Sequence, residues 1–337
     1  MNLQASQWLY PVRNRITLGL CLVLCFFLLS PPLSADSTLV ENPDFKLVRI
    51  DRDKSANGLA TEYLNDQHEG WQISELNGRS TFQSGDIVAL PLKPINPAAV
   101  YAHEYRGIPV LCYHQFSSGS TTRHQLEVSA TEFDKQMAYL VNNNYQVLPL
   151  RKMQEILSGK TSIPPKAVIL TIDDGYRSVY DIAFPILKKY GLTATLFVYT
   201  DFIGGSMALS WQQIKAMQSS GTIDIESHTK THSSLSFDDS KENIDTHRTR
   251  VAKEIDSAEA AIYKYLGHKS TILAYPYGNS SKDTVEHLKT SNYALATTVK
   301  RGFNSAFSYP LLLRRTMIYN SHTLDGFVKI IAGSQPR

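Results

Sequence analysis

The sequence predicts an α/β protein in which a small N-terminal module precedes a larger domain built on a mostly parallel sheet. From residue 108 to the C-terminus, short apolar stretches rich in Val, Ile and Thr alternate with helical stretches, a pattern typical of βα units. Six or seven such units suggest a barrel rather than an open sheet. The central stretch, Val168–Tyr176, reads V-I-L-T-I-D-D-G-Y. It is a buried strand that runs into two carboxylates and a glycine.

The first 35 residues have the layout of a secretory signal. Arg13 and Arg15 precede the uncharged stretch Ile16–Leu29, and two prolines and small residues follow it, an order typical of a cleavable signal peptide. The stretch is shorter than the roughly twenty residues that a membrane-spanning helix needs. We therefore expect a secreted, periplasmic or cell-envelope protein, with membrane anchoring through residues 16–29 as the alternative.

Residues 44–92 are expected to form a separate small module. Asp36–Pro43 is interpreted as a polar tether in front of it, and the segment 93–106, with Pro94 and Pro97, as an interdomain linker. Ser55 is placed to cap the first helix, and Asn77-Gly78 to stop the second. The expected order is a strand over 45–50, helices over 56–64 and 71–76, and a strand over 87–90.

The larger domain, residues 107–337, begins with an apolar strand and continues with alternating elements. Its strands are expected over residues 108–114, 145–148, 168–172, 194–199, 223–226, 272–275 and 294–298. Its helices are expected over residues 132–142, 150–157, 180–190, 211–219, 243–266, 282–291 and 323–332. Ser129 is placed to cap the first of these helices.

Asp173 and Asp174 stand at the end of the central strand, where α/β folds place their chemistry. Two adjacent carboxylates in apolar surroundings repel each other unless a positive charge lies beside them, and a metal ion would supply that charge. An ordinary Asp-Gly turn after a strand is the structural alternative.

A pair of histidines follows a later strand. His228 and His232 come directly after the strand-like Ile223–Glu226, and imidazoles four residues apart lie on one face of a helical turn and can bind one ion. With one aspartate they would form a two-His-one-Asp site that leaves positions open for water and substrate. We therefore expect a divalent metal, and among divalent metals Zn²⁺.

Three motifs together resemble those of the polysaccharide deacetylase family, the carbohydrate esterase family 4-like group with the chitooligosaccharide-deacetylase homology domain. They are T-I-D-D-G-Y, S-H-T-K-T-H and Tyr275-Pro276-Tyr277-Gly278. The resemblance extends from about residue 108 to the C-terminus. It implies an incomplete (β/α)7-type barrel and metal-dependent removal of N-acetyl groups from a glycan. Tyr113-His114, after an apolar strand, resembles the members that act on biofilm polysaccharides.

The resemblance also implies roles for single residues. Asp173 is the expected general base, and Asp174, His228 and His232 are the expected metal ligands. The residues by themselves do not decide which aspartate has which role. The backbone N–H of Tyr277 is expected to stabilise the oxyanion.

Four other residues are expected to contact the substrate. They are Tyr275, Pro276, Trp211 and His114. For Trp211 the structural alternative is core packing, and for His114 it is a histidine satisfied by local hydrogen bonds.

The chain departs from the family pattern at three places. Ile172 replaces the usual phenylalanine before the aspartate pair, and Ala274 replaces the arginine that orients the base. Arg314 and Arg315 are candidates for that orienting role. Leu313-Arg314-Arg315 stands near the position of the late Leu-Xaa-His that supplies the general acid, and His322 is the only histidine that late in the chain.

The N-terminal module resembles a LysM domain, a unit that binds polymers of N-acetylglucosamine. The matching segments are Leu59–Leu64, Trp71–Gly78 and Gly85–Pro91. The usual Gly-Asp-Thr after the first strand is here Asp53-Lys54-Ser55, which puts the glycan-contacting loop in doubt. A spacer with the same packing and no ligand is the alternative.

The expected function is therefore N-deacetylation of an extracytoplasmic N-acetylglucosamine polymer, either peptidoglycan or poly-N-acetylglucosamine. One alternative is a catalytically inactive glycan-binding protein. Another is a glycoside hydrolase with Asp173 and Glu226 as its two carboxylates, which leaves both histidines unexplained. The net charge of +3 over 337 residues and the lack of a basic, aromatic-rich run exclude a nucleic-acid partner. Cys112 is the only cysteine after residue 25 and is interpreted as a buried, inert thiol.

Overall fold

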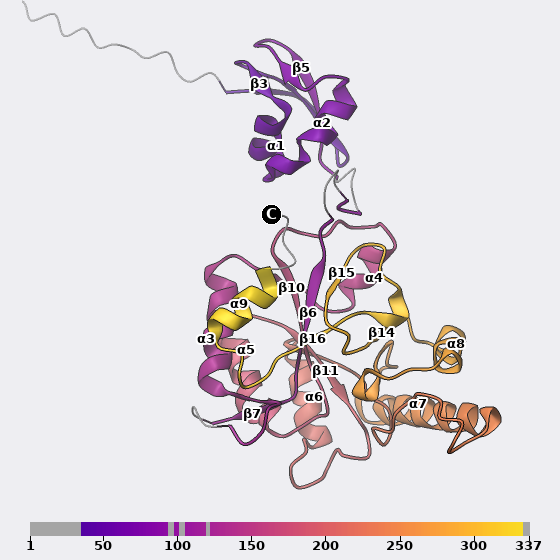
Figure 1. Ribbon diagram of the computed structural model, residues 1–337. Coiled ribbons are helices and arrows are strands. Elements are labelled where there is room, and N and C mark those ends of the chain that lie inside the picture. Colours follow the sequence, from indigo (N-terminus) through magenta and orange to yellow (C-terminus); the bar gives the residue numbers. More distant parts are fainter. Residues whose placement is uncertain (1–34, 94–97, 101–104, 119–121, 333–337) are drawn as a thin grey trace, which may run out of the picture. The chain divides into compact units, whose positions relative to one another are not determined.

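The computed structural model describes residues 35–93, 98–100, 105–118 and 122–332. The chain divides after Leu92 into two compact units (Figure 1). The predicted export segment lies outside the described residues, apart from Ala35. Within the described ranges no helix is long and apolar enough to cross a membrane.

The N-terminal unit contains the predicted order of strand, two helices and strand. Its helices are α1 (Ala56–Leu64) and α2 (Gly70–Asn77), and its strands are β1 (Ser37–Glu41), β2 (Phe45–Arg49), β3 (Lys54–Ser55), β4 (Thr81–Phe82) and β5 (Ile87–Pro91). β2 pairs antiparallel with β5, and apolar side chains from both strands and both helices share one core. The Ser55 hydroxyl accepts a hydrogen bond from the Gly58 N–H and caps α1, as expected.

The segment interpreted as a polar tether is instead partly a strand. β1 pairs antiparallel with β2 at the edge of the sheet, and all five of its residues are exposed. Burial therefore contributes little to β1, and its stability comes from backbone hydrogen bonds to β2. A strand with no buried face lacks the apolar alternation on which prediction depends.

The C-terminal unit follows the predicted alternation closely. Its strands are β6 (Ile108–Tyr113), β7 (Gln115–Ser117), β8 (Glu127–Ser129), β9 (Gln146–Val147), β10 (Ala167–Ile172), β11 (Ala194–Val198), β12 (Ile223–Ser227), β13 (Ile272–Ala274), β14 (Leu295–Thr297), β15 (Phe303–Asn304) and β16 (Thr316–Met317). Its helices are α3 (Ala130–Asn142), α4 (Lys152–Leu157), α5 (Phe184–Tyr190) with the π-helical turn Val179–Ala183 before it, α6 (Trp211–Ser219), α7 (Ile244–Leu266), α8 (Lys282–Thr290) and α9 (Leu324–Ala332). The Ser129 hydroxyl caps α3, as expected. The strands that were not foreseen, β7, β8, β15 and β16, have two or three residues each, too few to show a period.

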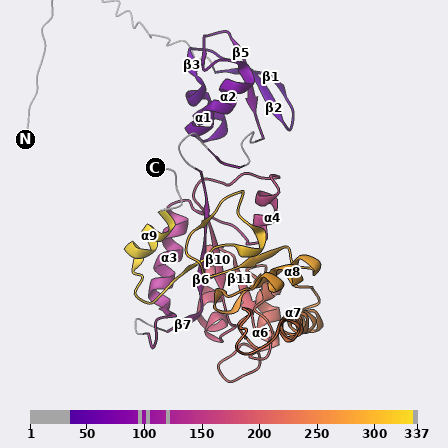
Figure 2. The same cartoon turned by 45° about the vertical axis from the view of Figure 1, so that its right-hand side comes forward.

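The main sheet is curled and parallel, except for β15, which pairs antiparallel with β6. Its strands lie in the order β14-β13-β12-β11-β10-β6, with β16 parallel to β6 on the far side. Leu313, just before β16, forms a bridge to Thr297 of β14, so the two ends of the sheet approach each other. In both views α3 and α9 lie together on one side of the sheet, and α7 and α8 lie together on the other (Figures 1 and 2). The α/β class and the curled parallel sheet agree with the prediction.

Register brings the carboxyl ends of the strands to one edge. Ile172 of β10 pairs with Tyr113 of β6, and Val198 of β11 pairs with Ser227 of β12. Side chains alternate between the two faces of a strand, so Ile169 packs in a different apolar cluster from Leu170. Asp173 continues the alternation of Ile169 and therefore points to the same side of the sheet.

Candidate metal and catalytic site

The chain turns sharply after β10, and the turn separates the two aspartates. The Asp173 N–H donates to the Tyr113 carbonyl at 2.9 Å, so Asp173 is still aligned with the sheet. Asp174 and Gly175 have φ values of +77° and +91°. A Cβ on Gly175 would lie 2.8 Å from Ile203 Cδ1, so both conformation and space require glycine there. The turn lets the Asp173 and Asp174 side chains face different partners.

His228 directly follows β12, and a backbone carbonyl orients its ring. Its Nδ1–H donates to the carbonyl of Ala274 at 2.7 Å. The other nitrogen, Nε2, therefore carries the lone pair, and it lies 3.7 Å from Asp174 Oδ1. A histidine held through one nitrogen with the other left for a metal is the usual arrangement of a metal ligand.

The segment between the two histidines is not the helical turn that their spacing predicted. Thr229 and His232 have φ values of +72° and +64°, which no right-handed helix contains. The His232 N–H donates to the Thr229 hydroxyl at 3.2 Å. From α7, the Glu254 carboxylate accepts hydrogen bonds from the Thr231 N–H (2.8 Å) and hydroxyl (2.7 Å). These contacts hold the strained loop in place.

Asp174, His228 and His232 nonetheless meet at one point. His232 Nε2 lies 3.5 Å from Asp174 Oδ1, and the chosen ligand atoms of all three residues lie within 4.8 Å of one another. Ligands on a tetrahedral zinc ion are separated by roughly 3.3 Å, given metal–ligand distances of about 2.0–2.1 Å. The three residues therefore fit a divalent ion of this kind.

Asp174 Oδ1 itself indicates that a cation belongs here. It is buried and accepts no hydrogen bond from the described residues, which is costly for a carboxylate oxygen. Burial, reinforced by the Asp173 charge, raises the pKa of Asp174 to about 7. Burial lowers the pKa of His228 to about 3 and also lowers that of His232, so both imidazoles are neutral and able to act as ligands.

Arg315 binds the other aspartate. Its Nη1 and Nη2 donate to Asp173 Oδ1 and Oδ2 at 2.6 and 2.7 Å, and both side chains are almost fully buried. Burial opposes ionisation of Asp173, but the Arg315 charge outweighs it and holds the pKa of this carboxyl below its usual range. The orienting arginine expected at position 274 is therefore replaced by one from just before β16. Of the two sequence candidates, Arg315 binds Asp173 and Arg314 does not.

Two more residues from β6 and its end adjoin Asp173. Cys112 is fully buried, and its thiol donates to Asp173 Oδ2 at 3.4 Å; burial raises its pKa well above the ordinary value, so it stays a thiol. His114 is buried and its Nδ1 has no hydrogen-bond partner among the described residues. Cys112, His114 and Asp173 form a second possible ligand set. Because Arg315 already occupies both oxygens of Asp173, a cation there would be repelled.

The residues of the Tyr275–Gly278 motif divide into an exposed one and buried ones. Tyr277 is 64% exposed, and its ring packs edge-on against His232 with centroids 4.6 Å apart. Tyr275 and Pro276 are buried, and the Tyr275 hydroxyl donates to the Leu311 carbonyl at 2.8 Å. The Tyr275 side chain is therefore packed inside the fold, and no part of it reaches the surface.

Trp211 belongs to the packing alternative that the sequence left open. Its ring stacks on Tyr265, near the end of α7, with centroids 4.5 Å apart, and it adjoins the main apolar core. Sequence reasoning missed a nearer aromatic residue, Tyr199, whose ring lies 5.2 Å from that of His232. The position of Tyr199 immediately after β11, at the carboxyl edge of the sheet, could have indicated that it lies near the site.

Glu226 has a structural role. Its Oε2 accepts hydrogen bonds from the Ser270 hydroxyl and from the N–H groups of Thr271 and Ile272 at 2.6, 2.9 and 3.0 Å. This carboxylate holds the start of β13 rather than facing Asp173. The late histidine, His322, is half-buried and accepts the Tyr319 N–H through Nδ1.

The segment that contains this site is similar in sequence to known polysaccharide deacetylases. Residues 160–296 match the family model for polysaccharide deacetylase. The putative polysaccharide deacetylase YxkH of Bacillus subtilis is 33% identical over 196 residues, 58% of this chain and 65% of that protein. The chain thus spans slightly less than two thirds of this relative's length. The poly-beta-1,6-N-acetyl-D-glucosamine N-deacetylase of Staphylococcus epidermidis is 26% identical over 69% of this chain and 79% of that protein.

A solved structure extends the likeness to the fold. The Streptococcus pyogenes deacetylase PplD in complex with acetate aligns with a TM-score of 0.60 and 26% identity, over 67% of this chain and 98% of that one. The aligned share fits the C-terminal unit, which holds the carboxylates, the histidines and Arg315. The C-terminal part of the chain is therefore similar to polysaccharide deacetylases, in sequence over residues 160–296 and in fold.

Proposed function

We propose that this protein is a metal-dependent N-deacetylase of an extracytoplasmic polymer of N-acetylglucosamine. The observation that carries the proposal is the pairing of two unlike carboxylates. Asp174 faces two neutral imidazoles and has an unsatisfied buried oxygen, whereas Asp173, one residue earlier, is held ionised by Arg315. Asp174 is therefore placed to bind a cation, and Asp173 is placed to accept a proton.

In this proposal Asp174, His228 and His232 hold a divalent ion, with Zn²⁺ as the expected metal. Such an ion would polarise the acetyl carbonyl and acidify the attacking water. Asp173 takes the proton of that water as general base, and Arg315 keeps it ionised and oriented. The backbone N–H of Tyr277, on the segment that packs against His232, donates to the oxyanion.

The leaving amine then needs a proton, and His114 is the proposed carrier. A nitrogen of its ring lies within 4.8 Å of the Asp173 carboxylate, so it can pass on the proton that Asp173 has taken. Burial lowers the pKa of His114 to about 4, so it would hold this proton only transiently. His114 would serve in place of the late histidine that the family pattern places near Leu313.

Poly-β-1,6-N-acetylglucosamine and peptidoglycan are the candidate substrates. The relative from Staphylococcus epidermidis, named for the first of these polymers, supports it. The N-terminal unit, with its LysM-like order of elements, is proposed to bind the same glycan. Its loop after β2 departs from the usual sequence, and there the Lys54 ammonium donates to Asp36 and Glu62. Residues 1–35 are proposed to direct export.

The deciding experiment is acetate release by the full chain from poly-β-1,6-N-acetylglucosamine oligomers, chitooligosaccharides and peptidoglycan. It is run with Zn²⁺, with a chelator, and with Asp173→Asn. Acetate that needs metal and is lost in Asp173→Asn supports the proposal. A folded protein that binds glycan but releases no acetate with any divalent metal contradicts it and favours an inactive glycan-binding protein.

A further inference from the structure

The C-terminal unit has a hollow that lies away from the metal ligands. It has a volume of about 570 Å³ and is formed around β15, which pairs antiparallel with the first residues of β6. The metal ligands lie at the carboxyl edge of the sheet. The six residues of β6 separate the two ends by roughly 17 Å, at about 3.3 Å per residue. The hollow is therefore distinct from the catalytic site.

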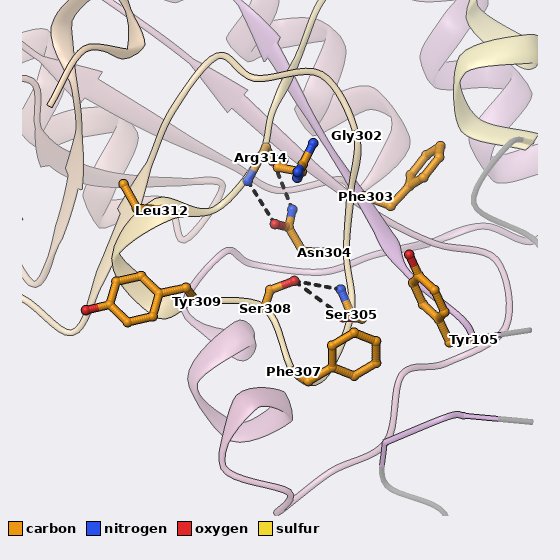
Figure 3. Close-up of a pocket in the computed structure, with 10 residues that line it drawn as sticks. All are labelled: Tyr105, Gly302, Phe303, Asn304, Ser305, Phe307, Ser308, Tyr309, Leu312 and Arg314. Carbon is orange, nitrogen blue, oxygen red and sulfur yellow. Dashed lines mark hydrogen bonds between the residues drawn. The ribbon is translucent and has the colours of Figure 1, made fainter.

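Exposed aromatic rings line this hollow. Tyr105 is 57% exposed, Phe307 is 62% exposed and Tyr309 is 46% exposed, and all three belong to its wall. The Tyr105 and Phe307 rings pack edge to face with centroids 5.1 Å apart. Figure 3 shows these two rings at one end and Tyr309 at the other. Large aromatic groups gathered in one exposed place, rather than scattered singly, indicate a binding surface.

Between the rings the wall is polar and rigid. The Asn304 side chain donates to the Arg314 carbonyl and accepts from the Arg314 N–H, both at 2.8 Å. The Ser305 N–H donates to the Ser308 hydroxyl at 3.0 Å (Figure 3). A Cβ on Gly302, at φ +148°, would lie 2.8 Å from Arg314 Cδ, so glycine here lets the Arg314 side chain lie across the backbone.

The described residues of the wall carry positive charge only. Arg314 is its only charged residue, and no carboxylate lines it among the described residues. Arg314 and Arg315 are neighbours in an extended segment, so their side chains point in opposite directions. One guanidinium serves the base, and the other stands in this hollow.

We propose that this hollow, lined by Tyr105, Phe307, Tyr309 and Arg314, is a non-catalytic binding site for the N-acetylated form of the glycan. A pyranose ring has apolar C–H faces that suit aromatic rings, and its hydroxyl and acetamido edges suit serine, asparagine and guanidinium groups. Deacetylated sugars carry ammonium groups, which Arg314 repels and to which the described residues of the wall offer no carboxylate. The site therefore retains acetylated stretches of polymer and releases the product. The preference for acetylated chain rests on the proposed function.

Binding is measured on the full chain by co-sedimentation with insoluble N-acetylated polymer and with the same polymer after chemical deacetylation. Tyr105→Ala/Phe307→Ala is expected to weaken binding to acetylated polymer about tenfold, because it removes two of the aromatic faces on which a sugar ring would lie. The matched control is Tyr263→Ala, also 57% exposed but on α7. Equal binding by parent and double variant would overturn the proposal. Arg314→Gln is expected to narrow the preference for acetylated polymer, and an unchanged preference would overturn the role of Arg314.

A local signal separates this site from the N-terminal unit and the catalytic site. The chain is labelled with 4-fluorophenylalanine, and Phe307→Leu identifies the resonance of Phe307. The proposal requires that this resonance shift on adding N-acetylated chitohexaose, with or without metal, and stay unchanged on adding the deacetylated hexamer. A shift on raising protein concentration alone would instead mark a contact between copies of the chain. Because neither readout needs turnover, the site can be confirmed or overturned even if no acetate is released.

Discussion

Arg315 and Asp173 are joined by two parallel hydrogen bonds although 142 positions separate them in the sequence. β16, which follows Arg315, lies beside β6, and β6 pairs with β10, which ends at Ile172. The Arg315 guanidinium also packs over the Phe197 ring at 5.4 Å and donates through Nε to the Thr298 carbonyl. Asp173, the proposed base, is thus oriented by an arginine from just before β16 rather than from position 274.

Removing this arginine should damage both stability and catalysis. Arg315→Met leaves a buried carboxylate without its partner, which costs about 3–5 kcal/mol in unfolding free energy. In the parent the depressed pKa of Asp173 keeps the base ionised through the neutral range. In the variant the charge that chiefly opposes burial is gone, so the pKa of Asp173 should rise and the acid limb of the kcat/KM–pH profile should move to higher pH.

The test of this role compares pH profiles and urea unfolding of parent, Arg315→Met and the control Arg151→Gln, an exposed arginine on the surface. The double variant Arg315→Met/Ala274→Arg restores an arginine at the position that the family pattern uses, and it should recover part of the activity. If Arg315→Met keeps the parent profile, Arg315 does not orient the base.

The Asp174 carboxylate should lower the unfolding free energy of the metal-free protein. Its folded pKa of about 7 lies above the unfolded value, so the folded form binds more protons between about pH 4 and pH 7. The metal-free protein should therefore lose stability as pH rises through that range. Asp174→Asn should raise the unfolding free energy at pH 8 by about 2–4 kcal/mol.

The same substitution should abolish metal binding. In the parent, metal affinity should fall as pH drops below about 7, since the carboxyl must lose its proton to bind. Chemical denaturation in chelator and calorimetric titration with Zn²⁺, each from pH 5 to pH 8, measure the two effects. A destabilised Asp174→Asn protein would show that the carboxylate has an unseen partner in the metal-free fold.

Glu254 should act on the metal through the histidine loop. Its carboxylate holds Thr231, next to His232, and does not touch the cluster itself. Glu254→Ala should weaken Zn²⁺ binding about 10–100-fold, the usual effect of losing a group that orients a ligand. Glu259→Gln, on the same helix and paired with Lys269, is the control. Zn²⁺ affinity equal to the parent's would mean that Thr229 alone is sufficient to hold the loop.

Glu226 distinguishes the deacetylase from the glycoside hydrolase alternative. Glu226→Gln keeps the shape but replaces a carboxylate that accepts four hydrogen bonds from residues 270–272, so it should cost about 1–3 kcal/mol in unfolding free energy. Acetate release per folded molecule should stay close to that of the parent. Loss of a glycan-cleaving activity in this variant would instead support the alternative in which Glu226 is the second catalytic carboxylate of a glycoside hydrolase.

The sequence by itself determined the parts of this protein that are local. The aspartate pair after an apolar strand, the histidine pair after another and the serine caps at Ser55 and Ser129 each lie within a few residues. Their patterns therefore predicted the elements and placed the aspartate pair and the histidine pair in one candidate site, while the choice of Asp174 as the ligand came from the family resemblance. The βα alternation predicted the curled parallel sheet for the same reason.

Only the tertiary structure decided what depends on which segments become neighbours. Short strands such as β16 carry no periodic signal, so nothing in the sequence placed Arg315 rather than Arg314 at Asp173. The left-handed residues Thr229 and His232 follow from contacts with α7, not from their spacing. Tyr275 is buried, and its hydroxyl donates to the carbonyl of Leu311, 36 positions further along the chain. In each case the physical reason is a long-range contact whose energy exceeds any local preference.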